Sequence, residues 1–211
     1  QLTMHSRVVI SVSAALIVVG TVLIKMTEDV TWLGAFFHSV SARTAGFSSY
    51  PLKEFSNSGL FVLIVLMFIG ASPGSTGGGI KTSTFFTLLM GIKSAATNQS
   101  EKAFHFAFPR DAFRKAAVVT LLALAVVLVG SYLMTIMEPD LRLIDILFEV
   151  TSAFGTVGLS TGITGGLTDG SKLLSILFMY IGRLGPLTIA SLWYFSRGER
   201  IGYAEGNIAI G

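Results

Sequence analysis

One stretch of the sequence, residues 70–84, limits what this chain can fold into more than any other. It reads Gly-Ala-Ser-Pro-Gly-Ser-Thr-Gly-Gly-Gly-Ile-Lys-Thr-Ser-Thr and overlaps an uncharged run of 26 residues from Phe55 to Ile80. A membrane-spanning helix needs roughly 20 apolar residues, but proline inside a helix costs about 3 kcal/mol and each glycine about 1 kcal/mol. Because irregular backbone at membrane depth must be buried in protein or line a water-filled path, the stretch predicts a pore or a binding cavity.

The same stretch has a second interpretation, as a loop that cradles the phosphates of a nucleotide. Such a loop requires glycine immediately before its lysine, whereas Ile80 precedes Lys81 here. It also follows a short buried strand, whereas the apolar run before this stretch has the length of a helix. A membrane ATPase is therefore the alternative from another functional class. It predicts that the isolated chain binds nucleotide and loses that binding in Lys81→Ala.

Composition indicates an integral membrane protein. Of the 211 residues, 52% are hydrophobic and only 13% are charged, against about 25% charged residues in soluble domains. The chain has no cysteine, which excludes disulfides and thiolate metal sites. The net charge of +3 is small, and nothing in its pattern indicates nucleic acid as a partner. Because Gln1 and the apolar run that follows are preceded by no leader, we expect a segment of a longer protein.

The order of the apolar runs predicts an all-α membrane fold. Three runs are long enough to span a bilayer and cover residues 8–24, 116–137 and 173–196. Two shorter runs, suited to re-entrant segments, cover residues 30–42 and 141–153. The helix interrupted at residue 70 is expected to resume from 84 to about 92. The predicted units are a first repeat at 1–92, a linker at 93–115, a second repeat at 116–197 and a tail at 198–211.

The two halves of the chain match one another. At a constant offset of 112 residues, Thr44–Ser48 matches Thr156–Ser160 and Met67–Gly70 matches Met179–Gly182. Shared aliphatic residues alone would not hold one offset through a loop and a helix. The chain is therefore expected to contain two membrane-pore-membrane repeats, each with a span, a short re-entrant helix, a glycine turn and a second span.

The distribution of charge predicts the orientation in the membrane. Basic residues are in excess in the linker and at Arg7, Arg197 and Arg200. Acidic residues gather on the opposite side, as at Glu28 and Glu138. Because cytoplasmic segments carry the basic excess, the linker and both termini are expected in the cytoplasm, and the glycine turns enter from outside.

The glycine turns at Gly46 and Gly158 have the chemistry of an ion filter. A short helix that ends at such a turn points its negative carboxyl end, about half an elementary charge, into the membrane. The extended segment that follows can present backbone carbonyls in place of an ion's hydration shell, as potassium filters do. The plainer alternative is that each glycine only forms a turn. Two such segments cannot close a ring, so the chain is expected to supply half of a pseudo-fourfold, potassium-channel-like pore, completed by a missing segment or a second chain.

Several stretches resemble the Trk/Ktr/HKT family of potassium transporters, and most of all the membrane subunits of bacterial Ktr systems. These are Ser41–Phe47, Gly70–Thr84, Ser152–Ser160 and the ending Gly206–Gly211. The resemblance covers essentially the whole chain, as the third and fourth of the family's four repeats. It implies potassium uptake across the cell membrane, with the alternative of a sodium-permeable transporter of the same fold, and no enzymatic activity. Family members that favour sodium often have serine at a filter glycine, and neither Gly46 nor Gly158 is serine.

The resemblance also assigns roles to individual residues. The implied filter consists of Thr44, Ala45, Gly46, Phe47, Thr156, Val157, Gly158 and Leu159. The implied intramembrane gate consists of Gly70, Ala71, Ser72, Pro73, Gly74, Ser75, Thr76, Gly77, Gly78, Gly79, Lys81 and Arg183. Potassium is the implied transported ion, sodium the alternative, and no cofactor is bound by this chain. The implied partners are membrane lipid, the missing repeats, a second copy in a homodimer and a cytoplasmic ring of nucleotide-binding subunits.

Four charged side chains in these segments have open roles. A charge inside a span costs about 2.5 to 3.5 kcal/mol, so Arg183 is expected to face the pore as an electrostatic barrier. Its structural alternatives are an ion pair with Glu149 or a hydrogen bond to loop carbonyls. Arg43 and Glu149 are expected to form a mutual or neighbouring salt bridge that fixes the filter backbone. Lys81 is expected either at the loop or at the inner membrane surface.

Overall fold

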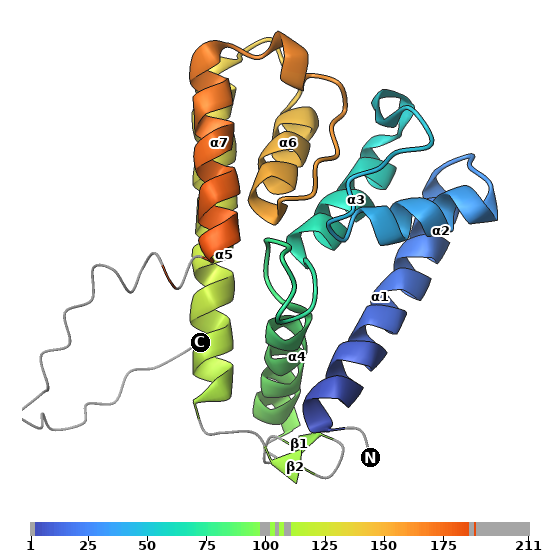
Figure 1. The fold of residues 1–211 in the computed structure, drawn as a ribbon, viewed down its shortest axis with the longest axis vertical. Helices are drawn as coiled ribbons and strands as arrows, with labels where there is room; N and C mark the ends of the chain where they lie inside the picture. Colours follow the sequence, from blue (N-terminus) through green and yellow to red (C-terminus); the bar gives the residue numbers. More distant parts are fainter. Residues whose placement is uncertain (1–2, 98–101, 104–105, 108–110, 186–187, 189–211) are drawn as a thin grey trace, which may run out of the picture.

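The chain folds into helices joined by short loops (Figure 1). The structure is a computed structural model, and it describes residues 3–97, 102–103, 106–107, 111–185 and 188. The helices are α1 (Met4–Thr27), α2 (Trp32–Ser41), α3 (Asn57–Phe68), α4 (Thr82–Thr97), α5 (Ala112–Met137), α6 (Leu143–Gly155) and α7 (Asp169–Leu184). Two 3-10 turns cover Leu52–Glu54 and Thr164–Gly166. The strands β1 (Lys102–Ala103) and β2 (Phe106–Ala107) form a two-residue hairpin in the predicted linker, a small departure from the all-α prediction.

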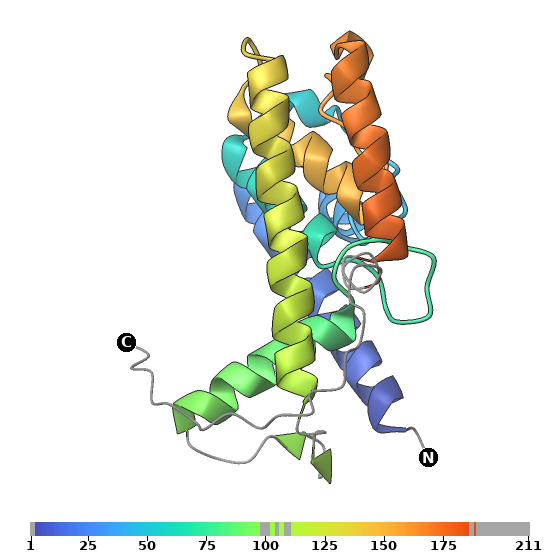
Figure 2. The ribbon, with the colours of Figure 1, turned by 90° about the vertical axis from the view of Figure 1, so that its left-hand side faces the viewer.

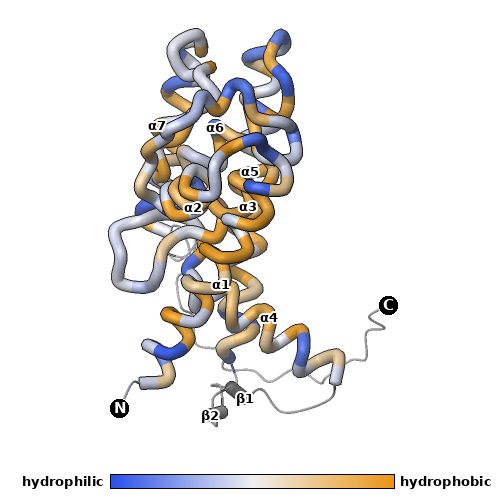
Figure 3. The backbone as a smooth tube through the Cα atoms, turned by 90° about the vertical axis from the view of Figure 1, so that its right-hand side faces the viewer, coloured by the Kyte–Doolittle hydropathy of each residue, from blue (hydrophilic) through white to orange (hydrophobic). Residues whose placement is uncertain are grey.

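Two of the helices, α1 and α5, are long and apolar enough to cross a membrane. They have 24 and 26 residues and extend beyond the predicted runs at both ends. Their exposed surfaces are mainly aliphatic, as at Val18, Val19, Leu121 and Leu128. Figure 3 shows hydrophobic residues along the helices and hydrophilic residues gathered in the loops at the upper end. These surfaces fit a lipid environment better than water, because soluble proteins rarely expose contiguous apolar patches of this kind.

The same order of elements occurs twice. A long helix is followed by a short one, an extended segment and a second helix, first in α1, α2 and α3 and then in α5, α6 and α7. The short helix packs on a helix of its own half, α2 on α1 and α6 on α7, and α3 packs on α6 and joins the halves. Large buried side chains that include Leu63, Met67, Phe148 and Phe154 fill this junction. Figure 2 shows α4 crossing beside the lower part of α5, where the two helices pack together.

The predicted break is present between α3 and α4. The ends of the break are pinned together, because Ile69 and Ile80 form a parallel bridge and the Ile80 backbone N–H donates to Phe68 O at 3.1 Å. The resumed helix starts at Thr82 rather than at residue 84 and continues to Thr97, into the predicted linker. Good helix formers at Ala95 and Ala96 favour this extension.

The last predicted span differs most from the structure. Helix α7 starts at Asp169, capped by the Thr168 hydroxyl, instead of at residue 173. It ends at Leu184 because Gly185 has a φ of 86°, a left-handed value that stops a helix. The remainder of the predicted span, except residue 188, and the tail at 198–211 lie outside the described residues.

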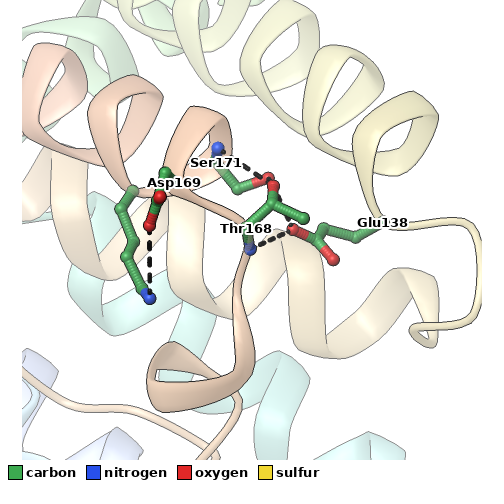
Figure 4. A network of polar contacts seen from close by, with 5 residues as sticks. Glu138, Thr168, Asp169 and Ser171 are labelled. Atoms are coloured by element: carbon green, nitrogen blue, oxygen red, sulfur yellow. Dashed lines mark hydrogen bonds and ion pairs between the residues drawn. The ribbon is translucent and has the colours of Figure 1, made fainter.

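Each half is closed by a carboxylate that holds the start of its second helix. Glu28 accepts hydrogen bonds from the backbone N–H and the hydroxyl of Ser56, at 2.9 and 2.6 Å. Glu138 accepts the same pair from Thr168, both at 2.7 Å (Figure 4). Ser56 and Thr168 are the N-caps of α3 and α7. They are separated by the same 112 residues that relate the two halves, so the clasp is part of the repeat.

The Glu138 clasp predicts a pH-dependent stability. Hydrogen bonds from the Thr168 backbone and then from the Ser171 and Thr168 hydroxyls lower the pKa of the Glu138 carboxyl below its ordinary value of 4.5. Stabilisation by a group with a lowered pKa is present above the unfolded-state pKa and is lost as the pH falls through the folded-state pKa. We therefore expect Glu138→Gln to lower the thermal unfolding midpoint in detergent at about pH 7, and this difference from wild type to vanish below about pH 3.

Glu54→Gln, which removes a carboxylate elsewhere in the loops, is the control for the change in net charge. A difference between wild type and Glu138→Gln that does not depend on pH would contradict this account of the clasp.

Candidate functional site

The extended segments that follow α2 and α6 lie directly against each other. A Cβ atom added at Gly46 would clash with the carbonyl oxygen of Val157 and would lie 3.4 Å from the Cα of Gly158. Backbone therefore contacts backbone at this point, and a side chain at residue 46 would separate the two segments. The structure thus brings together the two glycine turns predicted from the sequence, from halves that are far apart in the chain.

Both segments have the same unusual backbone conformation. Thr44 and Gly46 have φ values of 83° and 79°, and Thr156 and Gly158 have values of 51° and 93°. Among the described residues, Thr44 and Thr156 are the non-glycine positions with positive φ. A β-branched residue avoids this region, and holding one there costs on the order of 1–3 kcal/mol. Matching strain at matching positions indicates a functional constraint on the direction of the backbone carbonyls.

The short helices deliver their carboxyl ends to these segments. Ser41 O accepts the N–H groups of Ala45 and Gly46, at 3.0 and 3.1 Å. In the second half, Ser152 O accepts the Val157 N–H at 2.9 Å. The Ser41 hydroxyl also exchanges hydrogen bonds with the backbone of Phe47. The negative ends of α2 and α6 therefore lie beside the strained residues, where a cation is favoured.

The loop between α3 and α4 is attached to the first residue of both segments. The Gly78 N–H donates to Gly155 O at 3.1 Å and to the Thr156 hydroxyl at 2.7 Å. A Cβ atom at Gly77 would lie 2.6 Å from the Thr44 methyl group, and one at Gly78 would lie 2.6 Å from Phe154 O. Both positions therefore require glycine for close approach. The loop covers one end of the paired segments.

Three cationic side chains hold the carbonyls of the same loop. Arg183 donates from Nη1 to Thr76 O, and Lys81 donates from Nζ to Gly77 O. Arg43 donates from Nη2 to Gly70 O at 3.4 Å, and its other contacts are with the Ser13 carbonyl and hydroxyl on α1. For Arg183 and Lys81, the contact with the loop agrees with one of the alternatives that the sequence left open.

The expected salt bridge of Arg43 or Glu149 is wrong for the described part of the chain. Arg142 pairs there with Asp145 and Lys172 with Asp169, and Arg43, Glu149 and Arg183 take part in no salt bridge. Arg43 faces α1 and the loop, whereas Glu149 points to the segment after the second glycine turn. Its carboxylate accepts from the Ser160 hydroxyl and, at 2.9 Å, from the Thr164 hydroxyl. Each charge fixes local backbone without the other.

The remaining predicted loop residues lie away from the paired segments. Gly74, Ser75 and Thr76 are exposed, and a Cβ atom at Gly74 would have nothing within 4 Å. Ala71, Ser72 and Pro73 are partly buried, and the Ser72 hydroxyl lies 3.5 Å from that of Ser13. Sequence reasoning missed Ser13, which has no signal beyond its place in an apolar helix. It also missed Gly155, whose only signal is its place before the second turn.

Comparison with known proteins shows what this arrangement resembles. The sequence matches the TrkH family, described as cation transport proteins, over residues 2–195. It is 35% identical to Ktr system potassium uptake protein B of Vibrio alginolyticus, over 100% of this chain and 49% of the relative. It is 36% identical to the potassium/sodium uptake protein NtpJ of Enterococcus hirae, over 98% of this chain and 48% of the relative. The chain thus spans about half the length of these curated relatives.

The fold is also similar to that of a solved structure. The crystal structure of the potassium transporter TrkH from Vibrio parahaemolyticus superposes with a TM-score of 0.72 and 21% sequence identity. The superposition covers 90% of this chain and 44% of the other. At this identity the likeness concerns the fold alone, and it agrees with the all-helical arrangement described above.

The contact between Gly78 and Thr156 predicts how firmly the loop is held. Thr156→Val keeps the branched shape and removes the hydroxyl acceptor, which contributes about 1 kcal/mol net. We expect the amides of residues 76–79 in the full-length protein to exchange hydrogen about fivefold faster as a result. Thr151→Val is the matched control, because Thr151 lies buried on the same helix and its hydroxyl has no partner in the described structure. Equal exchange in both variants would show that this hydrogen bond does not anchor the loop.

Proposed function

The chain belongs to the TrkH family of cation transport proteins, and on this basis we propose that it carries potassium ions across a cell membrane. Membership in a transport family confirms that the chain is not an enzyme. One observation carries the proposal: two strained, matching backbone segments meet at Gly46 and Gly158 beside the carboxyl ends of two short helices. Backbone oxygens arranged in this way replace the hydration shell of a potassium ion.

In this proposal the filter is formed by residues 44–47 and 156–159. Left-handed and ordinary φ values alternate from Thr44 to Gly46 and from Thr156 to Gly158, which turns successive carbonyls toward a common side. The two segments supply two walls of a pathway that needs four. The chain spans about half of its relatives, so two further membrane-pore-membrane repeats outside it would complete the pseudo-fourfold ring.

The loop at residues 70–84 is the proposed gate. It lies against Thr44 and Thr156 at one end of the filter, where it would obstruct an ion that leaves the filter. Arg183 places a positive charge beside the same loop through its bond to Thr76 O. A positive charge in a pathway of low dielectric constant repels cations, so Arg183 lowers ion occupancy while the loop is in place. Opening requires the loop to leave Thr156 and Arg183.

Sodium is the second candidate ion. The Enterococcus hirae relative is named a potassium/sodium uptake protein, which favours this alternative more than any residue of the present chain does. Neither filter glycine is replaced by serine, so the sequence itself favours potassium.

The remaining expectations complete the proposal. We place the protein in the plasma or inner membrane as a multi-pass protein, with the linker and both termini of this segment in the cytoplasm. A homodimer and a cytoplasmic nucleotide-binding ring are the proposed assemblies. The linker at 93–115 and the tail at 198–211 are the proposed docking surfaces for the ring, and the tail lies outside the described residues.

Gly46→Ala tests the filter. The added methyl group clashes with Val157 O, and alanine at a left-handed φ costs about 1–2 kcal/mol in addition. We expect potassium uptake by the full-length protein in liposomes to fall at least about tenfold, since a shift of the carbonyls weakens every ion contact. Gly162→Ala is the control, because Gly162 also has a positive φ, of 96°, but has open space around its Cβ position. If both variants transport equally, the close approach of the two segments is not required.

Arg183→Gln tests the gate. Loss of a hydrogen bond from a charged donor, about 1.5–3 kcal/mol, frees Thr76 O, and the positive charge is removed as well. We expect potassium flux to rise about tenfold or more when no regulatory partner is present. Lys172→Gln on the same helix removes a charge whose partner is Asp169 and is expected to leave flux unchanged. A fall in flux in Arg183→Gln with an intact fold would assign Arg183 to ion conduction instead of closure.

A further inference from the structure

A second cavity, separate from the paired segments, lies between the two halves. It has a volume of about 380 Å³ and is enclosed by α3, α4, α5 and one side of α6. Its lining is aliphatic and aromatic apart from Thr120 and Thr151, and no charged side chain reaches it. The hydroxyls of both threonines are buried without a partner in the described structure and turn no polar atom into the cavity. We call this cavity the apolar groove.

The rim of the apolar groove continues into exposed apolar surface. Leu124 and Leu128 on α5 are 42% and 55% exposed, and Phe61 on α3 is 57% exposed. Helix α5 has the length and hydropathy of a membrane span. At that depth the medium around the protein is lipid hydrocarbon, so the groove opens to acyl chains and not to water.

We propose that the apolar groove binds one hydrocarbon chain of a membrane lipid. A charge-free lining offers nothing to a headgroup or a polar ligand and suits an alkyl chain. The volume also argues against a helix of another subunit, because a single helical turn about 10 Å wide and 5.4 Å long would already fill it. A flexible chain can occupy the groove along its whole length.

The position of the groove links such a lipid to the loop, a step that rests on the proposed function. Phe68 and Ile69 at the end of α3, and Ile80 and Phe85 at the start of α4, all line it. Ile69 and Ile80 are the residues whose bridge pins the two ends of the break. A bound chain therefore packs on the pinned base of the loop and stabilises the arrangement in which the loop covers the filter.

Photo-crosslinking tests the site independently of transport. The full-length protein is reconstituted with a phospholipid that carries a diazirine in its acyl chain, and adducts are mapped by mass spectrometry. We expect adducts in the peptides that contain Leu88 and Leu124. Leu124→Trp fills the groove, and labelling of the Leu88 peptide should fall at least about tenfold, the effect of excluding two or so methylene groups. Leu121→Trp, on the 66% exposed side of the same helix, is the control and should keep that labelling.

Leu88→Trp fills the groove from the opposite wall and should abolish labelling of Leu124 peptides, which guards against a folding defect in one variant. Labelling that is uniform over the lipid-facing surface, or that Leu124→Trp does not change, overturns the site. A cross-link from the groove to another protein chain does so too. Potassium flux is measured in the same liposomes. If the filling variants lose the adduct but keep wild-type flux, the link to the loop is rejected, and absent flux in wild type counts against the proposed function alone.

Discussion

The central constraint on this structure is that backbone polar groups at membrane depth must find partners inside the protein. The break between α3 and α4 frees such groups over some twelve residues, and the partners found in the structure come from the rest of the fold. Gly78 bonds to Gly155 and Thr156 of the other half, while Arg183, Lys81 and Arg43 donate to loop carbonyls. The loop is therefore attached to both paired segments, and any movement of the loop must change the surroundings of the filter.

The same constraint accounts for the twofold repeat within the chain. Each half needs a short helix whose carboxyl end lies inside the protein, and each half ends that helix in a strained threonine two residues before a glycine. The strain at Thr44 and Thr156 is held by rigid surroundings: α2 and α6 are packed against neighbouring helices, and the clasps at Glu28 and Glu138 fix where the second helix of each half begins. Rigid clasps at one end and a glycine-rich loop at the other divide each half into a fixed part and a movable part.

Much of this arrangement could be predicted from residue patterns. Glycines and a proline inside an apolar run can only mean a break, and the constant offset around Gly46 and Gly158 could reveal the repeat because both turns need glycine. The partners of the charged residues could not be predicted, since Arg43 and Glu149 look alike in sequence as flanking charges, whereas packing turns one to Ser13 and the other to Ser160. The clasp residues were visible only as acids that indicated orientation. The apolar groove had no signal at all, because its lining comes from four helices and looks in sequence like any lipid-facing surface.

The central claim is that the loop is the barrier to ion flow. The most direct test is potassium flux into liposomes that contain the full-length protein, with and without residues Ala71–Gly79. The account predicts a higher flux in the deletion variant, because the segment that covers the filter is gone while Ile69 and Ile80 still flank the break. Unchanged flux in a deletion variant that remains folded would contradict the account and would place control of the pathway elsewhere, at Arg183 or in a partner.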